Sequence, residues 1–412
     1  VTIHGPICGV CNEGQGEAAN MKQGNSVFAD YGTTIFAVMS QLCLDHDAIN
    51  LGQGFPDTDG PLDIRQKAAD ALIDGPNQYP SVLGVPDLRR AVAETNKRFY
   101  DLDVDWQTEV MVTSGATEAL ADCILGLINP GDEVVMIEPL YDSYLPMVRR
   151  AGGVPRLVRM QPPGWELPRD DLAAAFSDKT KMIILNSPHN PAGKVFDTDE
   201  LSFIAGLLKK HDAYAVCDEV YEHLVFDGLD HIPLMTLPGM RDRCLRIGSA
   251  GKTFSVTGWK IGYITASAEL LTMVAKAHQF NTFTTAPNLQ LAAAYGLRKD
   301  DTYFSGLASD MGAKRDRLQA GLRDIGFETM DSQGSYFLTV DFRPLGFNGD
   351  DAEFCRHSTT EAGVGAVPVG AFYQNDGAEA APRHFARFCF CKGDAMLDEA
   401  IQRLSRHFKT RS

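Results

Sequence analysis

Short apolar runs without polar alternation recur along the first two thirds of the chain. Each run is brief and β-prone, which is typical of strands that are buried on both faces. Stretches with helical character lie between several of them, at residues 116–127 and 200–210. This alternation predicts a mostly parallel sheet covered by helices, an α/β fold. The predicted strands cover residues 133–138, 181–185, 214–217, 244–247 and 261–264.

The pattern changes after residue 300, where apolar positions at helical spacing predict one long amphipathic helix. Strand-like segments follow at residues 335–342 and 385–391, and a helix near residues 397–408 closes the chain. This order predicts a smaller α+β domain, joined by residues 26–58 from the front of the chain. The apolar positions of the long helix are Leu307, Met311, Leu318, Leu322 and Ile325.

The length of 412 residues exceeds what one hydrophobic core usually supports, so two domains are expected. Residues 1–25, rich in Gly, Asn, Gln and Glu, are predicted to be a flexible leader. We predict a large domain at residues 59–299 and a small domain at residues 300–412, which residues 26–58 complete.

Charge and hydropathy exclude several classes of partner. The net charge of −16 disfavours nucleic acid and anionic membranes. No apolar run reaches the roughly 18 residues of a membrane span. Residues 1–21 lack the apolar core of a signal peptide, so a cytoplasmic location is predicted.

The cysteines and histidines give no disulfide or metal pattern. Nine cysteines are scattered over the chain, which favours reduced thiols. Cys8 and Cys11 form a single CxxC pair, whereas a zinc site would need a second pair nearby. The ten histidines show no HExxH spacing, so no metal site is predicted.

Residues able to bind a small ligand follow four of the predicted strands. In open α/β sheets, ligands bind beyond the carboxyl ends of the strands. Taken singly, an Asp after a strand is often a helix cap, and Asn-Pro is often a turn. Their convergence on one sheet edge favours a ligand site. In chain order the residues are Tyr141, Asn186 with Asn190, Asp218 with Tyr221, and Ser249 with Lys252.

Residues 249–260, SAGKTFSVTGWK, resemble the cofactor-lysine segment of class I aminotransferases. The similarity is greatest to the branch with kynurenine/glutamine, methionine and succinyldiaminopimelate aminotransferase-like enzymes. It covers roughly residues 26–410 and implies the aspartate-aminotransferase fold, with pyridoxal 5′-phosphate as cofactor. Further motifs of the same branch, in the same order, lie at residues 51–57, 77–80, 186–193, 218–223 and 387–392.

The resemblance implies a role for each residue around the cofactor ring. Lys252 forms the Schiff base with the pyridoxal aldehyde, where a solvated lysine is the simpler alternative. Asp218 keeps the ring nitrogen protonated. Tyr221 and Asn190 hydrogen-bond the ring hydroxyl, and Tyr141 stacks on the ring.

The resemblance also implies a phosphate site. The start of the predicted helix 116–127 offers free N–H groups that suit a dianion. Residues that match the family's remaining phosphate ligands complete the predicted phosphate site. The predicted phosphate-binding residues are Gly115, Ala116, Thr117, Ser249 and Lys260.

Tyr79 matches the tyrosine that reaches the phosphate from the neighbouring subunit. If this match holds, each active site takes residues from two chains. The resemblance therefore implies a homodimer with shared sites.

Arg387 is the candidate for binding the substrate carboxylate. It lies in an apolar strand, on the face opposite Ala386 and Phe388, where an arginine is costly unless paired. A substrate carboxylate fits such a bidentate partner, and an internal Asp or Glu is the alternative. Asn190 and the backbone of Gly54 complete the predicted carboxylate site.

Aromatic residues predict the choice of amino donor. Phe36 matches the family position that covers the substrate side chain, Phe283 falls in a loop that relatives send across the dimer, and Phe372 adds to this rim. They favour a large neutral donor such as methionine, phenylalanine or kynurenine, although Phe36 and Phe283 could instead pack the dimer interface. Succinyldiaminopimelate is the alternative donor; it would want a second cation, and these segments hold no lysine or arginine.

The predicted function is transfer of an amino group from an L-amino acid to a 2-oxo acid by a ping-pong mechanism. A cysteine-conjugate β-lyase would use the same Lys252 and stays open. A dinucleotide-dependent oxidoreductase is disfavoured because residues 363–368 and 52–57 lack the third glycine of the fingerprint. A pyridoxal-binding regulator would need a DNA-binding module, which residues 1–25 cannot supply.

Overall fold

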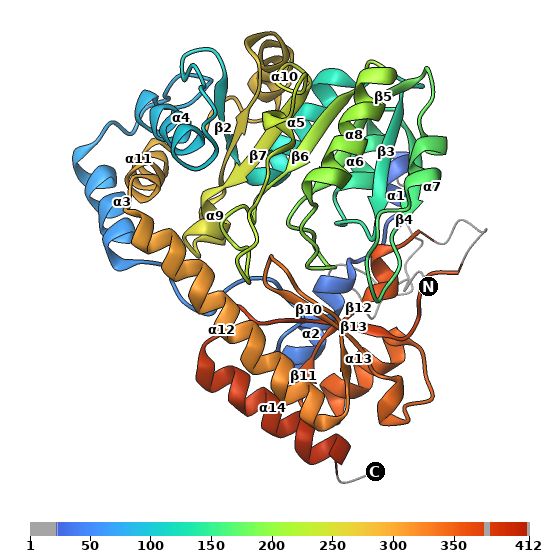
Figure 1. Cartoon of the computed structure of the whole chain (residues 1–412). Helices are drawn as coiled ribbons and strands as arrows, with labels where there is room; N and C mark the ends of the chain where they lie inside the picture. The colour runs from blue at the N-terminus through green and yellow to red at the C-terminus, as the bar shows by residue number, and fades with distance from the viewer. Residues whose placement is uncertain (1–21, 23, 375–379, 410–412) are drawn as a thin grey trace.

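The computed structural model describes residues 22, 24–374 and 380–409. Cys8, Cys11 and nearly all of the predicted leader lie outside the described residues. Figure 1 shows two parts, one built on a seven-stranded sheet and one on a four-stranded sheet. No helix among the described residues is long and apolar enough to cross a membrane.

The larger sheet has the strand order β2-β8-β7-β6-β5-β3-β4. Neighbouring strands are parallel except at β8, which is antiparallel to β2 and β7. Residues 250–260 join β7 to β8 and hold only short helical turns, whereas a parallel crossover usually needs a full helix. The predicted mostly parallel sheet and its five strands are confirmed. The strands are β2 (Val110–Ser114), β3 (Glu133–Glu138), β4 (Val154–Arg159), β5 (Thr180–Asn186), β6 (Tyr214–Asp218), β7 (Cys244–Ser249) and β8 (Ile261–Thr265).

Alternate residues of the central strands face two hydrophobic cores. In β3, Val134 and Met136 belong to a core shared with α5, α6 and α10, whereas Val135 and Ile137 belong to one shared with α7 and α8. A third core joins α3, α4 and α11 to β2 and β8. Burial of both faces explains why these strand sequences lack polar alternation. The helices are α3 (Leu62–Asp74), α4 (Pro86–Tyr100), α5 (Gly115–Leu127), α6 (Tyr144–Arg150), α7 (Arg169–Ala175), α8 (Thr198–Lys210), α9 (Ala250–Thr253), α10 (Ala268–Asn281) and α11 (Pro287–Leu297).

The smaller sheet is antiparallel, in the order β12-β13-β10-β9. The predicted long helix, two strand segments and closing helix correspond to α12, β10, β13 and α14, and are confirmed. From the front of the chain, β1 pairs in parallel with β11 and α2 contacts α13, whereas α1 contacts α6. The elements are α1 (Ser26–Ala29), α2 (Ile35–Asp45), β1 (Ile49–Asn50), α12 (Asp301–Ile325), β9 (Glu328–Thr329), β10 (Phe337–Asp341), α13 (Asp351–Thr360), β11 (Val364–Gly365), β12 (Val367–Pro368), β13 (Phe385–Cys389) and α14 (Asp394–Phe408).

We propose that the domains follow this division. Residues 59–299 would form the large domain, and residues 26–58 would join residues 300–412 in the small one. The pairing of β1 with β11 and the contact of α2 with α13 support this assignment.

Candidate active site

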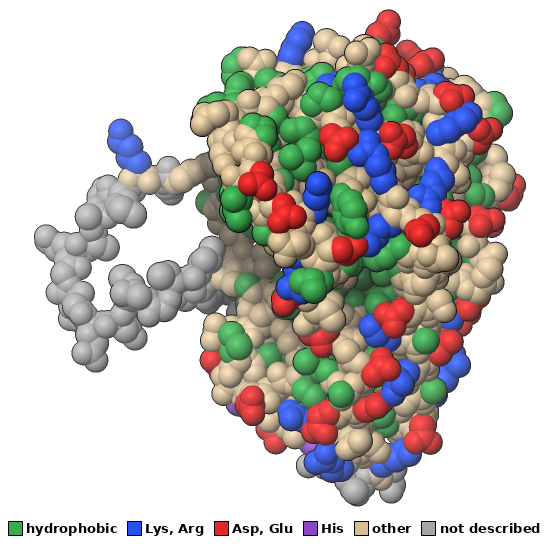
Figure 2. Space-filling model, turned by 90° about the vertical axis from the view of Figure 1, so that its left-hand side faces the viewer, with side chains coloured by type: hydrophobic (Ala, Val, Ile, Leu, Met, Phe, Trp, Pro, Cys, Tyr) green, Lys and Arg blue, Asp and Glu red, His purple; other side chains and the backbone are tan. Residues whose placement is uncertain are grey.

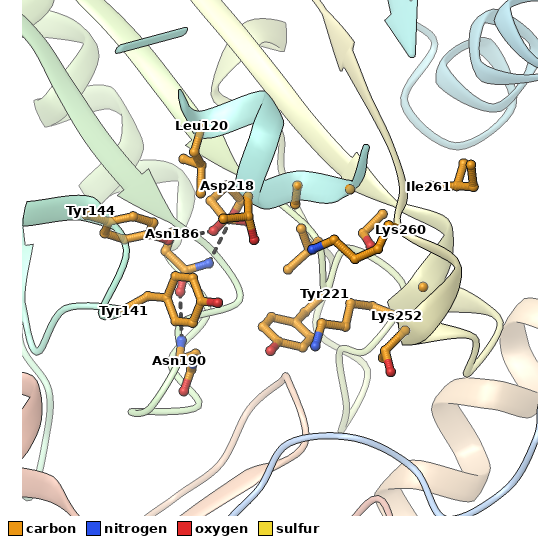
Figure 3. A pocket seen from close by; sticks show the side chains of 17 residues that line it. Leu120, Tyr141, Tyr144, Asn186, Asn190, Asp218, Tyr221, Lys252, Lys260 and Ile261 are labelled. Atoms are coloured by element: carbon orange, nitrogen blue, oxygen red, sulfur yellow. Dashed lines mark hydrogen bonds between the residues drawn. The ribbon is translucent and has the colours of Figure 1, made fainter. Parts of the chain in front are cut away.

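A cavity of about 210 Å³ lies at the carboxyl ends of β5, β6 and β7, beside the start of α5 (Figure 3). The strands end together here, with Asn186 of β5 opposite Asp218 of β6. All the residues predicted to bind the cofactor line this cavity except Tyr79, which is 81% exposed. The predicted residues that line it are Gly115, Ala116, Thr117, Tyr141, Asn190, Asp218, Tyr221, Ser249, Lys252 and Lys260.

Lys252 lies on α9, in the turn that follows β7, and its amine points into the cavity (Figure 3). Nζ donates a hydrogen bond to Tyr336 Oη at 2.7 Å and lies 3.4 Å from the Gly54 carbonyl oxygen. Burial lowers the pKa of this amine. A larger share of Lys252 is therefore uncharged at neutral pH, as a nucleophile or general base requires.

Asp218 ends β6, and its carboxylate has one oxygen paired and one unpaired. Oδ2 accepts a hydrogen bond of 2.6 Å from Tyr144 Oη, whereas Oδ1 is buried and has no partner among the described residues. Burial raises the pKa of this carboxyl group. An unpartnered buried oxygen is costly, so the site suits a ligand that brings a cationic N–H group.

Three polar side chains line the cavity between Lys252 and Asp218. Tyr221 is buried, and burial raises the pKa of its phenol, so the phenol stays a hydrogen-bond donor. The Asn190 backbone N–H donates to Asn186 Oδ1 at 2.8 Å, which fixes its loop. The half-buried Tyr141 ring lies edge-on to Tyr144, with centroids 5.7 Å apart.

The start of α5 and Lys260 bring two positive groups together. Gly115 has φ +77°, and a Cβ atom built on it would lie 3.2 Å from Lys260 Nζ. The free N–H groups of a helix start carry partial positive charge, so an ammonium group beside them is unfavourable alone. A bound anion would satisfy both. Ser249, buried at the end of β7, lines the same cavity.

Arg387 in β13 is 1% exposed and faces the chain's own polar atoms. Its guanidinium donates to Asn190 Oδ1 at 2.9 Å and to the Gly52 carbonyl oxygen at 2.5 Å, and stacks 4.0 Å from the Phe337 ring centroid. Its Nε has no hydrogen-bond partner among the described residues. Burial lowers its pKa to about 10, whereas the charge of Asp142 acts in the opposite direction. Asp142 is therefore a candidate for the alternative of an internal acid partner, although no ion pair joins the two side chains.

Residues 46–404 match the family model described as aminotransferase class I and II. The chain belongs to this family. It is therefore a transaminase that uses pyridoxal 5′-phosphate, and the predicted aspartate-aminotransferase fold is confirmed by its structural neighbours.

The relatives of this aminotransferase are named for different substrates. It is 46% identical over 382 residues to a probable N-succinyldiaminopimelate aminotransferase of Mycobacterium tuberculosis, across 91% of this chain and 96% of that protein. It is 38% identical over 373 residues to the methionine aminotransferase of Escherichia coli, across 90% and 95%. The chain superposes with a TM-score of 0.90 on the solved structure of N-succinyldiaminopimelate aminotransferase from M. tuberculosis, covering 93% of this chain and 100% of that one. It superposes equally well, with a TM-score of 0.90, on the solved structure of the E. coli methionine aminotransferase, covering 94% of this chain and 100% of that one.

The cavity fits the parts of pyridoxal 5′-phosphate. The unpartnered Asp218 Oδ1 suits the protonated ring nitrogen, and the pair formed by Lys260 and the start of α5 suits the phosphate. The Lys252 amine suits the aldehyde carbon. These features belong to three separate elements of the aminotransferase, and all face one cavity.

The aromatic residues predicted to choose the donor fall into two places. Phe36 and Phe372 meet edge-to-face at 5.6 Å, and both rings lie near the Arg387 guanidinium, at 5.2 and 5.0 Å. Phe283 instead lies beside Tyr79, with ring centroids 5.3 Å apart. The structure brings the first pair beside the Arg387 guanidinium and leaves the second pair at the surface of the described chain.

Sequence reasoning missed two residues of this site, Tyr144 and Tyr336, and gave a third, Asn186, no separate role. Tyr144 holds Asp218, and Asn186 donates to the Asp218 carbonyl oxygen at 2.9 Å. Tyr336 accepts from Lys252 and donates to the Gly54 carbonyl oxygen at 2.6 Å. Asn186 had been noted as following a strand, and its position at the strand end could have assigned it. Tyr144 lies three residues after Tyr141, but no sequence signal marks Tyr336.

Proposed function

We propose that this cavity is where the aminotransferase moves an amino group from an L-amino acid to a 2-oxo acid. The observation that carries the proposal is that the buried Lys252 amine and the unpartnered Asp218 oxygen face the same cavity. Holding a group with a reactive carbonyl and a protonatable ring nitrogen requires both features. Absorption spectra recorded while an amino donor and then a 2-oxo acid are added would test both halves of the exchange.

When bound, pyridoxal 5′-phosphate draws electrons from the substrate's α-carbon and makes the proton there acidic. Lys252 would hold the cofactor covalently through Nζ. Once released, the same Nζ would accept the α-carbon proton and later donate it, as general base and then acid. Tyr336 and the Gly54 carbonyl orient Nζ for this transfer.

Arg387 would hold the substrate's α-carboxylate through its two terminal nitrogens. Its contacts with Asn190 and Gly52 already fix the plane of the guanidinium, and Phe337 covers one face of it. Little side-chain freedom is left to lose on binding. Gly54 stays a predicted carboxylate contact, with its carbonyl turned toward Tyr336.

Two classes of amino donor fit the site. Phe36, Tyr141 and Phe372 favour a large neutral side chain, as predicted from the sequence. A groove of about 1130 Å³ adjoins these residues and is also lined by Arg149 and Arg356. These arginines are the cations that the sequence segments lacked, and they make a donor with a distal carboxylate, such as N-succinyldiaminopimelate, the second candidate. The same groove is also lined by acidic residues, namely Asp30, Asp142, Asp350, Asp351 and Glu353, which oppose such a donor.

A donor panel with the Arg356→Ala variant separates the two classes. If the groove binds a distal carboxylate, the variant should lose about tenfold in kcat/KM for N-succinyldiaminopimelate, about 1.4 kcal/mol, and nothing for methionine. Arg356 is exposed on α13 and is not bonded to other described side chains, so its removal should leave the fold intact. A wild-type preference for methionine, phenylalanine or kynurenine, with no effect of Arg356→Ala, would keep the neutral donor in first place.

We propose that the active chain is a homodimer with shared sites. Tyr79 is exposed in the single chain, and exposed apolar side chains occur nearby in the fold, among them Phe280 (84%) and Ile73 (79%). Figure 2, which views the side of α3, α4 and α11, shows hydrophobic side chains among the charged ones. Exposed apolar surface of this kind supports an interface with a second copy.

Subunit mixing tests the shared site. A heterodimer of Lys252→Ala and Tyr79→Phe subunits should contain one site with neither change. After exchange at equal concentration, activity should return to about a quarter of the wild-type value, because half of randomly paired dimers are mixed. Tyr79→Phe alone must be impaired for this comparison. A sedimentation experiment that shows a fully active monomer would contradict the proposal of shared sites.

A cysteine-conjugate β-lyase activity would use the same Lys252, so it is the remaining alternative within enzymes. It would break the carbon–sulfur bond of a cysteine conjugate and, with water, release a thiol, ammonia and a 2-oxo acid without any acceptor acid. A cytoplasmic location stays a prediction.

A further inference from the structure

His278, on α10, lies buried between two carboxylates of α5. Its Nδ1 is 2.8 Å from Glu118 Oε1 and 3.4 Å from Asp122 Oδ2. Its Nε2 is 3.0 Å from the Val82 carbonyl oxygen. The side chains of His278 and Asp122 are 0% exposed and that of Glu118 is 9% exposed. Figure 1 shows α5 and α10 side by side above the large sheet.

The contacts require hydrogens on both ring nitrogens of His278. A carbonyl oxygen only accepts, so Nε2 must donate to Val82, while ionised Glu118 only accepts, so Nδ1 must donate to it. Burial lowers the pKa of His278, but the nearby carboxylates of Asp122 and Glu118 outweigh burial and raise the pKa to about 9. Two carboxylates and one imidazolium give the cluster a net charge of −1.

Glu118 connects this cluster to the predicted phosphate site. Its second oxygen, Oε2, accepts a short hydrogen bond from the Ser114 backbone N–H. Ser114 directly precedes Gly115, where α5 begins and meets Lys260. The position of Glu118 therefore fixes the peptide from which the phosphate-binding turn starts.

His278 also holds the two segments that carry Tyr79 and Phe283. Nε2 fixes the Val82 carbonyl, three residues after Tyr79. The His278 carbonyl oxygen accepts the backbone N–H of Phe283 at 2.9 Å. Thr284 Oγ1 donates to the Ser81 carbonyl oxygen at 3.3 Å, so the two segments are also bonded to each other.

We propose that His278 is a positioning residue that, in its protonated form, fixes the phosphate-binding start of α5 relative to the segments bearing Tyr79 and Phe283. The inference rests on the proposed phosphate site. Loss of the proton removes the hydrogen bond to Glu118 and, with both carboxylates ionised, leaves the cluster at a net charge of −2. Both changes disfavour a phosphate dianion at the start of α5.

Two carboxyl groups face His278: burial raises the pKa of Asp122, whereas hydrogen bonds outweigh burial and lower the pKa of Glu118. Glu118 and Asp122 are the charged groups from α5. The segment before α4 contributes the Val82 carbonyl, and the end of α10 contributes Asn281, whose amide donates to Asp122 Oδ1 at 2.8 Å. Among these described groups His278 is the basic side chain, so it is the one that loses a positive charge as the pH rises.

The test uses the holoenzyme in its pyridoxamine 5′-phosphate form, because this form has no covalent bond to Lys252. Equilibrium dialysis at about pH 7 to about pH 10 gives the dissociation constant across the range in which His278 titrates. The wild type should bind progressively more weakly as the pH rises through about 9. His278→Gln, which keeps an N–H donor but not the charge, should bind about tenfold more weakly at neutral pH and lose this pH dependence.

A second variant separates charge from shape. Glu118→Gln with His278→Gln restores the net charge of −1 and should recover most of the lost affinity at neutral pH. A purely structural role for His278 would give no recovery. His357→Gln, the same substitution at the histidine that pairs with His407, is the matched control and should bind like the wild type.

Three results would overturn the proposal. One is His278→Gln binding with wild-type affinity and pH profile, and another is no recovery in the double variant. The third is a stoichiometric divalent metal in the purified protein that is lost in His278→Gln, since the ligand atoms of Glu118, Asp122 and His278 lie within 4.8 Å of one another. If the wild type itself binds no pyridoxamine 5′-phosphate, the proposed function fails instead.

Discussion

Replacing Lys252 by alanine is expected to lower turnover at least about 10⁵-fold, equivalent to about 7 kcal/mol in the barrier. The loss should be this large because one amine both holds the cofactor and moves the α-carbon proton. Burial lowers the pKa of Lys252, which prepares the amine for both roles. Steady-state rates with saturating cofactor and donor measure the effect.

Two other lysine variants test whether the loss of turnover is specific to the Lys252 amine. Lys252→Arg keeps a cation but cannot serve as the nucleophile, so it should be nearly as inactive. Lys210→Ala, at an exposed position on α8, removes a lysine far from the cavity lining and should keep wild-type turnover. A Lys252→Ala protein within about tenfold of the wild type would contradict the role of this residue.

Replacing Asp218 by alanine is expected to lower kcat about 10³-fold, about 4 kcal/mol. Its free Oδ1 is the described group best placed to hold the ring nitrogen protonated, and an unprotonated ring is a weaker electron sink. Single-turnover rates with the holoenzyme would separate this chemical defect from weaker cofactor binding.

Tyr144→Phe is the matched comparison for Asp218. It removes the 2.6 Å hydrogen bond to Oδ2 but leaves the carboxylate in place. Its expected cost is about tenfold, in line with one hydrogen bond to a charged group. Equal losses in Tyr144→Phe and Asp218→Ala would mean that Asp218 acts only through its packing.

The fold could be predicted wherever burial leaves a pattern in the sequence. Residues 133–138 read as a strand because both faces of β3 are covered. β4, at the edge of the sheet, was missed because its residues alternate in exposure, with Val154 at 39%. Its Arg156 and Arg159 pair with carboxylates of β3 and hide the apolar signal. β2 was also missed.

The site residues that could be predicted from the sequence are those that lie at or directly after the ends of the strands. Asp218 and Ser249 end parallel strands, and Lys252 follows directly, so topology alone brings them together. Tyr336, which directly precedes β10, contacts Lys252 on α9 across 84 residues of sequence, and no local pattern encodes that contact. Tyr79 does not line the described cavity, so the role proposed for it depends on a second chain.

Borohydride reduction of the holoenzyme, followed by peptide mass mapping, tests the central claim most directly. Reduction makes a lysine–cofactor bond permanent, so the modified residue can be read from the digest. We predict one cofactor-derived mass per chain, on the peptide that contains Lys252 and at that residue. The same mass on Lys260 or on another lysine, or no covalent modification of a cofactor-saturated protein, would contradict the assignment.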